Sequence, residues 1–220
     1  VSVVVVGLAF LASCSGDDGG QAVSEASTAT AVDVSTTMAP PDSTLPAATT
    51  TTVEAGPLRI LVTNDDGVDA DGIDAIVEGL LTLDNVEVTV VAPATNQSGT
   101  GGKTTDGTLT VNDATTKSGY PAKAVVGFPA DTIIWALDQG GIDFIPDLVV
   151  SGINKGQNYS LEIIPVSGTV GAARSAVLHN VPALALSQGD NAGRNDFPSG
   201  VAAGLDWIRA NFDALLARAD

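Results

Sequence analysis

The chain has 220 residues and a formal charge of −17, from 26 acidic residues against 9 basic ones. This charge argues against nucleic-acid polymers and anionic lipid surfaces as partners, because there is no stripe of Lys and Arg to replace their counterions. The single Cys excludes an intramolecular disulfide. A small phosphorylated ligand stays compatible with an acidic chain if a metal ion and backbone amides neutralise it locally.

The first 14 residues are typical of a bacterial lipoprotein signal peptide. Val1–Ala12 is an apolar run of signal-peptide length, too short to span a bilayer as a stable helix. It leads into Leu11-Ala-Ser-Cys14, which resembles a lipobox. The alternative is a buried free Cys in a core strand. We expect lipidation of Cys14, which would place the protein outside the cell. It would be anchored by lipid alone to the outer face of a bacterial cell membrane, or lie in the periplasm.

Residues 15–56 differ in composition from the rest of the chain. They are rich in Ser, Thr, Ala and Pro and show no apolar period of a helix or strand. Such a composition cannot bury enough surface to offset its ordering entropy, so a disordered tether is predicted. Residues 57–220 have the length of one domain.

Strands and helices alternate along this domain. Asp69 or Asp71 is the predicted N-cap of the first helix, and Pro129 opens the second. This order predicts an α/β fold with a doubly wound, mainly parallel sheet and helices on both faces. Strands are predicted at 58–62, 86–91, 122–126, 147–150 and 183–186, with a shorter one at 108–111, and helices at 73–81, 129–137, 168–178 and 201–218.

The most informative segment is Asn64-Asp65-Asp66-Gly67, directly after the first strand. Two adjacent carboxylates at the end of a buried strand repel each other. A divalent cation with oxygen ligands is the usual compensation. The alternative is an Asx-type turn in which Gly67 supplies a positive φ.

Three further polar stretches follow predicted strands, at 92–99, 127–131 and 151–154. In an open α/β sheet, ligands bind outside the carboxyl ends of the strands. Four such stretches at one edge therefore predict a binding site there.

These motifs, together with Ser167-Gly168-Thr169-Val-Gly171, resemble the survival protein SurE family over about residues 58–188. The resemblance implies a Rossmann-like core and a metal-dependent 5′/3′-nucleotidase that hydrolyses phosphate monoesters. Carried over position by position, the metal ligands are Asp65, Asp66, Ser98 and Asn154. Two carboxylates and neutral oxygens suit Mg²⁺ or Mn²⁺, with Ca²⁺ as a further candidate.

The same resemblance implies the chemical roles of the remaining site residues. Asp65 or Asp66 would orient or deprotonate the attacking water, or attack directly. The phosphate would be held by Asn64, Asn96, Lys103, Ser167, Gly168 and Thr169.

Other features favour an alternative function. Phe128 and Val166 differ from the residues that are usual in the family at these positions. The family also continues beyond the last helix with segments that build a homo-oligomer. We therefore expect the C-terminal segments of the family to be missing. The alternative is a non-catalytic surface lipoprotein that uses the fold as a phosphate- or nucleotide-binding module.

Two rival motifs are weaker. The run 98–104 resembles a P-loop, but Gln97 stands where that motif needs Gly, and no helical period follows. His179 lies at a predicted helix end, where capping is favoured over catalysis, and no Gly-x-Ser-x-Gly elbow supports a serine hydrolase. Ser167 has two compatible roles, as a helix N-cap and as a phosphate ligand.

Overall fold

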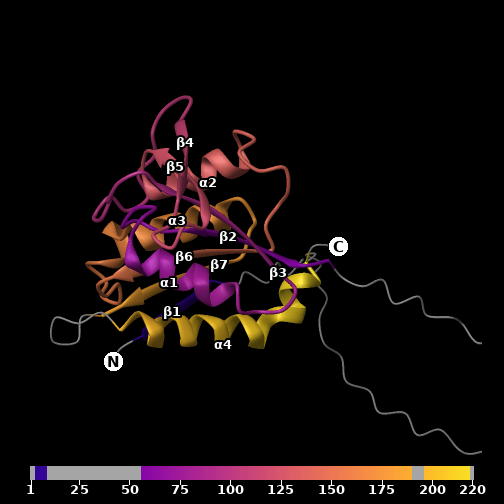
Figure 1. The fold of residues 1–220 in the computed structure, drawn as a ribbon. Helices are drawn as coiled ribbons and strands as arrows, with labels where there is room; N and C mark the ends of the chain where they lie inside the picture. The colour runs from indigo at the N-terminus through magenta and orange to yellow at the C-terminus, as the bar shows by residue number, and fades with distance from the viewer. Residues whose placement is uncertain (1–2, 9–55, 190–195, 219–220) are drawn as a thin grey trace, which may run out of the picture. The chain divides into compact units, whose positions relative to one another are not determined.

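The computed structural model of the chain describes residues 3–8, 56–189 and 196–218. Its strands form one sheet in the order β1-β7-β6-β2-β3-β5-β4 (Figure 1). The inner strands run parallel, whereas β1 pairs antiparallel with β7 and β4 antiparallel with β5. The strands are β1 (Val3–Leu8), β2 (Leu58–Thr63), β3 (Val86–Pro93), β4 (Thr110–Thr115), β5 (Pro121–Val126), β6 (Leu148–Lys155) and β7 (Ala183–Gln188).

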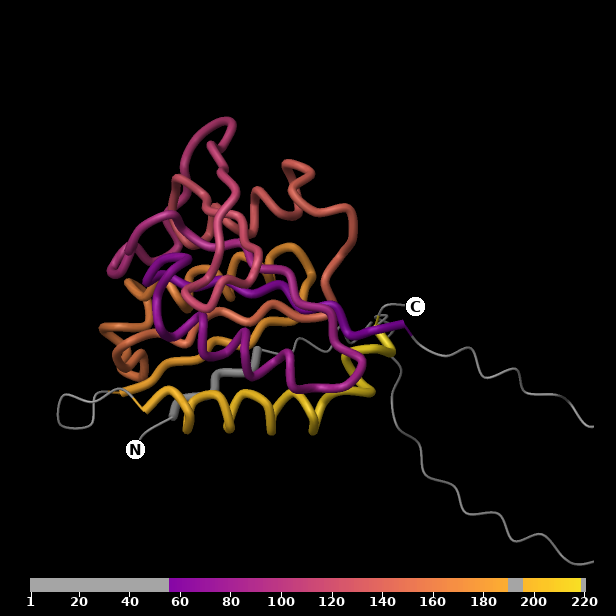
Figure 2. The backbone as a smooth tube through the Cα atoms, in the orientation of Figure 1, coloured from indigo at the N-terminus to yellow at the C-terminus, as the bar shows by residue number. Residues whose placement is uncertain are grey.

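Helices cover both faces of the sheet, as the alternating pattern predicts. α1 and α4 pack side by side on one face, and α2 and α3 pack together on the other (Figure 2). Successive side chains of β2 point to opposite faces, so Ile60 and Val62 join the core under α1 and α4, while Leu61 joins the other. Burial on both faces explains the continuous apolar strands. The helices are α1 (Asp71–Leu80), α2 (Pro129–Leu137), α3 (Gly168–Leu178) and α4 (Phe197–Leu216), with a 3₁₀ turn η1 (Ile164–Val166).

The bounds of α2 and α3 agree with the predicted helices, whereas α4 begins earlier than expected. Asp196 is the N-cap of α4, and its carboxylate accepts hydrogen bonds from the Ser199 backbone N–H (3.3 Å) and hydroxyl (2.6 Å). Pro198 lies in the first turn of the helix, where its missing N–H costs nothing. The apolar period starts only at Val201, so periodicity alone places the helix start too late.

Two other expectations need correction. Ala70, not Asp69 or Asp71, is the N-cap of α1, and no side chain caps this helix. β4 is longer than predicted. Its extent is set by pairing with β5, which the apolar pattern of the sequence does not reveal.

The structure does not test the interpretation of the N-terminal segment. Cys14 and almost all of the expected tether lie outside the described residues, while Val3–Leu8 forms the edge strand β1 beside β7. The signal peptide and lipidation therefore stay predictions. Within the part of the chain that the structure describes, no helix has the length and apolarity needed to cross a membrane.

Candidate functional site

The segments that follow β2, β3 and β6 meet at the carboxyl edge of the sheet, because these strands are neighbours. The Gln97 backbone N–H donates to the Asp65 carbonyl (2.7 Å), and the Lys155 N–H donates to Asp66 Oδ2 (2.9 Å). α3 begins at the same place, where the Thr169 hydroxyl reaches Asp65. The structure thus brings most of the site residues expected from the sequence to one rim.

The turn after β2 is an Asx turn and also carries the two carboxylates. The Asn64 amide donates to the Gly67 carbonyl (2.8 Å) and accepts from the Gly67 N–H (3.3 Å), and Gly67 has φ +111°. The two alternatives considered for this motif are therefore compatible. Asn64 is fully buried and both polar atoms of its side chain bond to Gly67, so it holds the turn, and its contact with phosphate stays a prediction.

Asp65 is buried and held by residues from distant parts of the chain. Its Oδ1 accepts a hydrogen bond from the Thr169 hydroxyl (2.7 Å). The oxygen of this hydroxyl in turn accepts a hydrogen bond from the Asn158 amide (3.4 Å). Asn158 also donates to the Ser187 hydroxyl (2.8 Å), and Ser151 donates to the Thr169 carbonyl (2.8 Å). Sequence reasoning missed Asn158, whose signal is only that of a polar loop residue shortly after Asn154.

Asp66 is half-buried and held by two loops. In addition to the Lys155 N–H, it accepts from the Asn96 amide at Oδ1 (3.3 Å). The Asn96 oxygen accepts from the Ser98 N–H (2.9 Å). Both polar atoms of Asn96 therefore position the loop and Asp66, in addition to any contact with a ligand.

The pKa values of both carboxylates are raised above the usual value of an aspartate. Burial raises the pKa of Asp65, the bond from Thr169 lowers it, and the charge of Asp66 raises it again, with a net increase. Burial also raises the pKa of Asp66, against the lowering effects of Lys155 and Asn96. Among the described residues, neither carboxylate forms an ion pair with Lys or Arg. A bound cation is therefore the natural partner of this pair.

The start of α3 packs closely against Asp65. A methyl group built at Gly168 would lie 2.7 Å from Asp65 Cβ and 3.0 Å from Asp65 Oδ2. The absence of a side chain at Gly168 thus lets the start of α3 approach this carboxylate closely. Asn154 lies next to the Lys155 N–H, and its amide nitrogen is committed to the Gly156 carbonyl (2.9 Å), which leaves its oxygen as the candidate ligand. Ser98 is exposed and joins the site through Asn96.

The start of α3 supplies hydrogen-bond donors. Ser167 is its N-cap and accepts from the Val170 N–H (3.2 Å), as the sequence predicts. The N–H groups of Gly168 and Thr169 lie in the first turn, where a helix offers them no internal acceptor. This is the geometry that binds phosphate oxygens at helix N-termini.

The loop that carries Lys103 packs against this helix start. The Gly101 N–H donates to the Val166 carbonyl (2.9 Å), and a methyl group built at Gly171 would lie 2.1 Å from the Gly101 carbonyl oxygen. Asp131 fixes the far end of the loop, because it is buried and accepts from the Thr105 N–H (2.9 Å) and hydroxyl (2.7 Å). The side chain of Lys103 is exposed on this loop.

A cavity of about 300 Å³ opens beside Asp66. Sequence reasoning did not assign a role to this cavity. Asp69 and Asp71 follow the Asx turn closely in sequence, so the sequence contained a signal that they lie near Asp66. Phe197 reaches the cavity only through the packing of α4, and no local sequence signal indicates its place there. The cavity is lined by Asp66, Asp69, Ala70, Asp71, Gly72, Asn96, Lys155 and Phe197.

Comparisons with known proteins agree with this arrangement. The family model "Survival protein SurE" matches residues 60–217. A 5′-nucleotidase SurE of Halobacterium salinarum is 47% identical over 135 residues, which cover 61% of this chain and 48% of that relative. The 5′-nucleotidase SurE 1 of Chlamydia caviae is 43% identical over 136 residues, 60% of this chain and 47% of the relative.

Structural similarity points to the same family. The crystal structure of the SurE protein from Aquifex aeolicus matches with a TM-score of 0.59 and 30% identity, over 70% of this chain and 60% of that one. The chain spans about half the length of the curated relatives that it matches. Because the family model covers most of the domain, the chain belongs to the survival protein SurE family.

Proposed function

We propose that this protein is a divalent-metal phosphomonoesterase that releases phosphate from nucleoside 5′- or 3′-monophosphates. The observation that carries the proposal is the carboxylate pair of Asp65 and Asp66, without an ion-pair partner among the described residues, beside the start of α3. The names of the relatives, 5′-nucleotidase SurE, support the substrate class.

Asp65, Asp66, Ser98 and Asn154 would hold the ion, and oxygen donors of this kind fit Mg²⁺ or Mn²⁺, with Ca²⁺ as a further candidate. When bound, the ion would supply positive charge beside the phosphate and lower the pKa of a nearby water.

The other steps belong to the chain itself. The Gly168 and Thr169 N–H groups and the Ser167 hydroxyl would bind phosphate oxygens, and Lys103 would add positive charge from its loop. Asp66 lines the cavity, whereas Asp65 is buried and held by Thr169. Asp66 is therefore the better placed of the two to accept a proton from the attacking water.

Phosphate release from AMP tests this proposal. The protein is assayed with Mg²⁺ or Mn²⁺ and then with excess chelator, together with Asp65→Asn and Asp66→Asn. We expect chelation or either substitution to lower the rate by about a hundredfold or more. Asp84→Asn is the matched control, because Asp84 is exposed in the turn before β3, at the opposite end of the strands.

Unchanged activity in both variants would rule out the metal assignment. Binding of AMP without any turnover would instead support the alternative, a phosphate- or nucleotide-binding module.

We also propose that the protein is held at the cell surface by a lipid on Cys14, and the lipobox-like sequence supports this. Cys14→Ser should move the protein from the membrane fraction to the soluble fraction. Retention of this variant in the membrane fraction would contradict lipid anchoring.

A further inference from the structure

The cavity beside Asp66 is lined by residues of two kinds. Asn96 and Lys155 bond to Asp66, through the Asn96 amide and the Lys155 backbone N–H. Asp69 and Asp71, from the loop before α1 and its first residue, line the cavity together with Phe197 of α4. The leaving group of a phosphate ester held beside Asp66 would enter this cavity.

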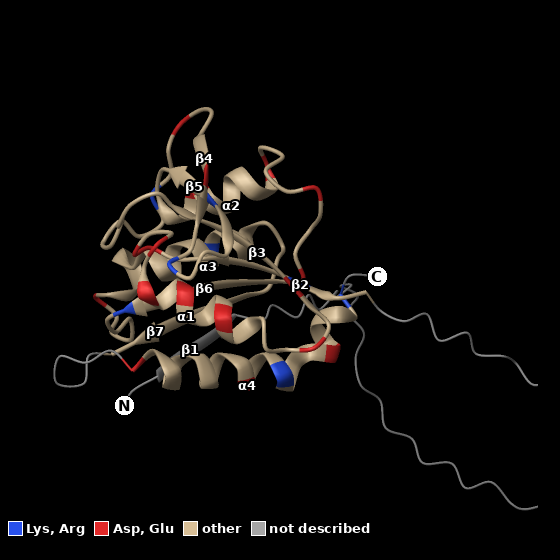
Figure 3. Ribbon diagram, viewed as in Figure 1, with Lys and Arg blue, Asp and Glu red and all other residues tan. Residues whose placement is uncertain are grey.

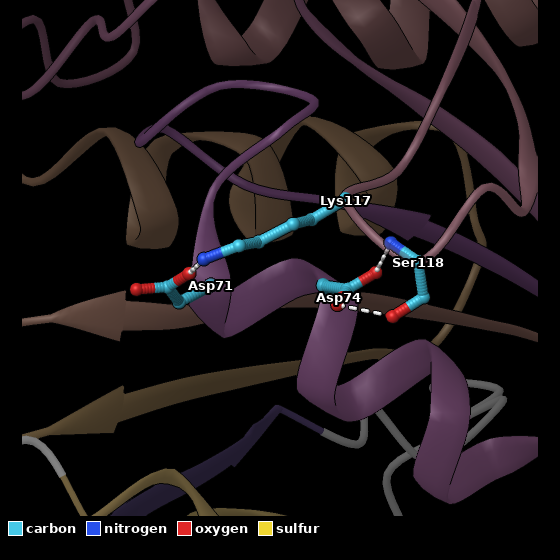
Figure 4. A network of polar contacts seen from close by, with 4 residues as sticks. All are labelled: Asp71, Asp74, Lys117 and Ser118. Atoms are coloured by element: carbon cyan, nitrogen blue, oxygen red, sulfur yellow. Dashed lines mark hydrogen bonds and ion pairs between the residues drawn. The ribbon is translucent and has the colours of Figure 1, made fainter.

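The lining of the cavity is mainly acidic. α1 carries Asp71, Asp74 and Glu78 and no Lys or Arg, so Asp and Glu mark this helix along its length (Figure 3). Lys117 forms an ion pair with Asp71 from the turn between β4 and β5 (Figure 4). Both side chains of this pair are more than half exposed, so water screens it. The lining residues themselves include three carboxylates and one ammonium group.

The ring of Phe197 forms an apolar wall of the cavity. Phe197 is half-buried and packs over Gly72, where a built methyl group would lie 3.1 Å from the ring atom Cε1 and 1.9 Å from the Ile153 carbonyl oxygen. Any side chain at Gly72 would displace α1 or the ring. Gly72 therefore lets α1 approach β6 closely and holds Phe197 and Asp71 at one cavity.

We propose that this cavity is the leaving-group pocket and that Asp69, Asp71 and Phe197 select the leaving group by charge and shape. Carboxylates accept hydrogen bonds from hydroxyl and amino groups and repel negative charge, while the Phe197 ring packs against a flat ring. The pocket favours an uncharged, hydroxyl-bearing leaving group with a ring, such as a nucleoside, over one that carries a further anionic group. This inference rests on the proposed function, since it assigns the leaving-group side of the same site.

The first experiment measures charge selection. The ratio of kcat/KM for 4-carboxyphenyl phosphate to that for phenyl phosphate is compared in the wild type, Asp69→Asn and Asp71→Asn. The two esters differ by one negative charge on the leaving group. Each substitution should raise the ratio by about fivefold, the effect of one unit charge at contact distance in water. Asp84→Asn should leave the ratio unchanged.

The second experiment needs no turnover. Adenosine alone is titrated into the protein, and backbone amide signals are followed by NMR. Adenosine should shift the signals of Asp71 and Gly72, and Phe197→Leu should weaken its binding by about tenfold, because stacking on the ring is lost.

The two experiments separate the inference from the proposed function. Ester hydrolysis with unchanged ratios in both Asp variants, or no shift at Asp71 and Gly72 with adenosine at millimolar concentration, would overturn the pocket. Adenosine binding at these residues in a protein that hydrolyses no phosphate ester would support the pocket and reject the proposed function.

Discussion

The hydroxyl of Thr169 donates a 2.7 Å hydrogen bond to Asp65 Oδ1, although the two residues are 104 positions apart in the chain. This bond joins the first turn of α3 to the end of β2. It partly offsets the rise in the pKa of Asp65 that burial and Asp66 cause. Thr169 therefore acts as a positioning residue for the carboxylate, in addition to the phosphate contact offered by its backbone N–H.

The first prediction concerns this bond. Thr169→Val keeps the shape of the side chain but removes the donor, and it should lower metal affinity or kcat by about 10- to 100-fold. Thr169→Ser keeps the hydroxyl and should retain most of the activity. The measurement is kcat/KM as a function of metal concentration. Full activity of Thr169→Val would show that this hydrogen bond is not needed.

The second prediction concerns the space beside Asp65. Gly168→Ala places a methyl group 2.7 Å from Asp65 Cβ and 2.9 Å from Pro129 Cγ. Relief of this overlap must displace Asp65 or α2, so we expect loss of phosphatase activity and a free energy of unfolding lower by about 1–3 kcal/mol. Gly56→Ala, where a methyl group meets no atom within 4 Å, is the control in the same assays. Full activity of Gly168→Ala would mean that this space is not needed.

The third prediction concerns the turn between β4 and β5. Asp74 of α1 is 9% exposed and accepts hydrogen bonds from the Ser118 N–H (2.8 Å) and hydroxyl (2.7 Å) (Figure 4). Asp74→Ala should lower the free energy of unfolding by about 1–3 kcal/mol, because both donors lose their partner. Glu78→Ala, an exposed residue of the same helix, should change it by less than about 0.5 kcal/mol. Chemical denaturation measures both, and equal effects would argue against this docking contact.

The fourth prediction concerns pH. His179 joins two helix ends, with Nδ1 2.6 Å from the Ser175 carbonyl oxygen and Nε2 2.9 Å from Asp138 Oδ2. Burial lowers the pKa of His179, but the bonds to Ser175 and Asp138 and the Asp138 charge outweigh it, so the net shift is upward from 6.5.

A raised folded-state pKa means that the protonated pair stabilises the fold fully below about pH 6.5, and that this contribution is lost as pH rises through the folded-state value. Asp138→Asn should therefore cost stability mainly on the acid side, with the difference from wild type shrinking at higher pH. Denaturation curves over this range check the sign. A difference that grows with pH would contradict it.

Local patterns predicted a large part of the fold. β2 and β6 are apolar runs ended by polar motifs, and α2 and α3 start at Pro129 and after Ser167, which are strong local signals. β4 and the start of α4 were predicted less well. The hydrogen bonds of β4 come from a partner strand, and Asp196 caps α4 before the apolar period begins.

The sequence by itself determined the order of strands and helices after residue 57, the carboxylate pair Asp65-Asp66 and the helix start at Ser167, because each depends on residues close together in the chain. Only the tertiary structure decided what surrounds the pair. It placed Thr169 against Asp65, turned Asn64 inward to its own loop, and brought Phe197 to the cavity beside Asp71. Such contacts depend on how the sheet and helices pack, and residues far apart in sequence carry no local signal of the neighbours that packing assigns to them.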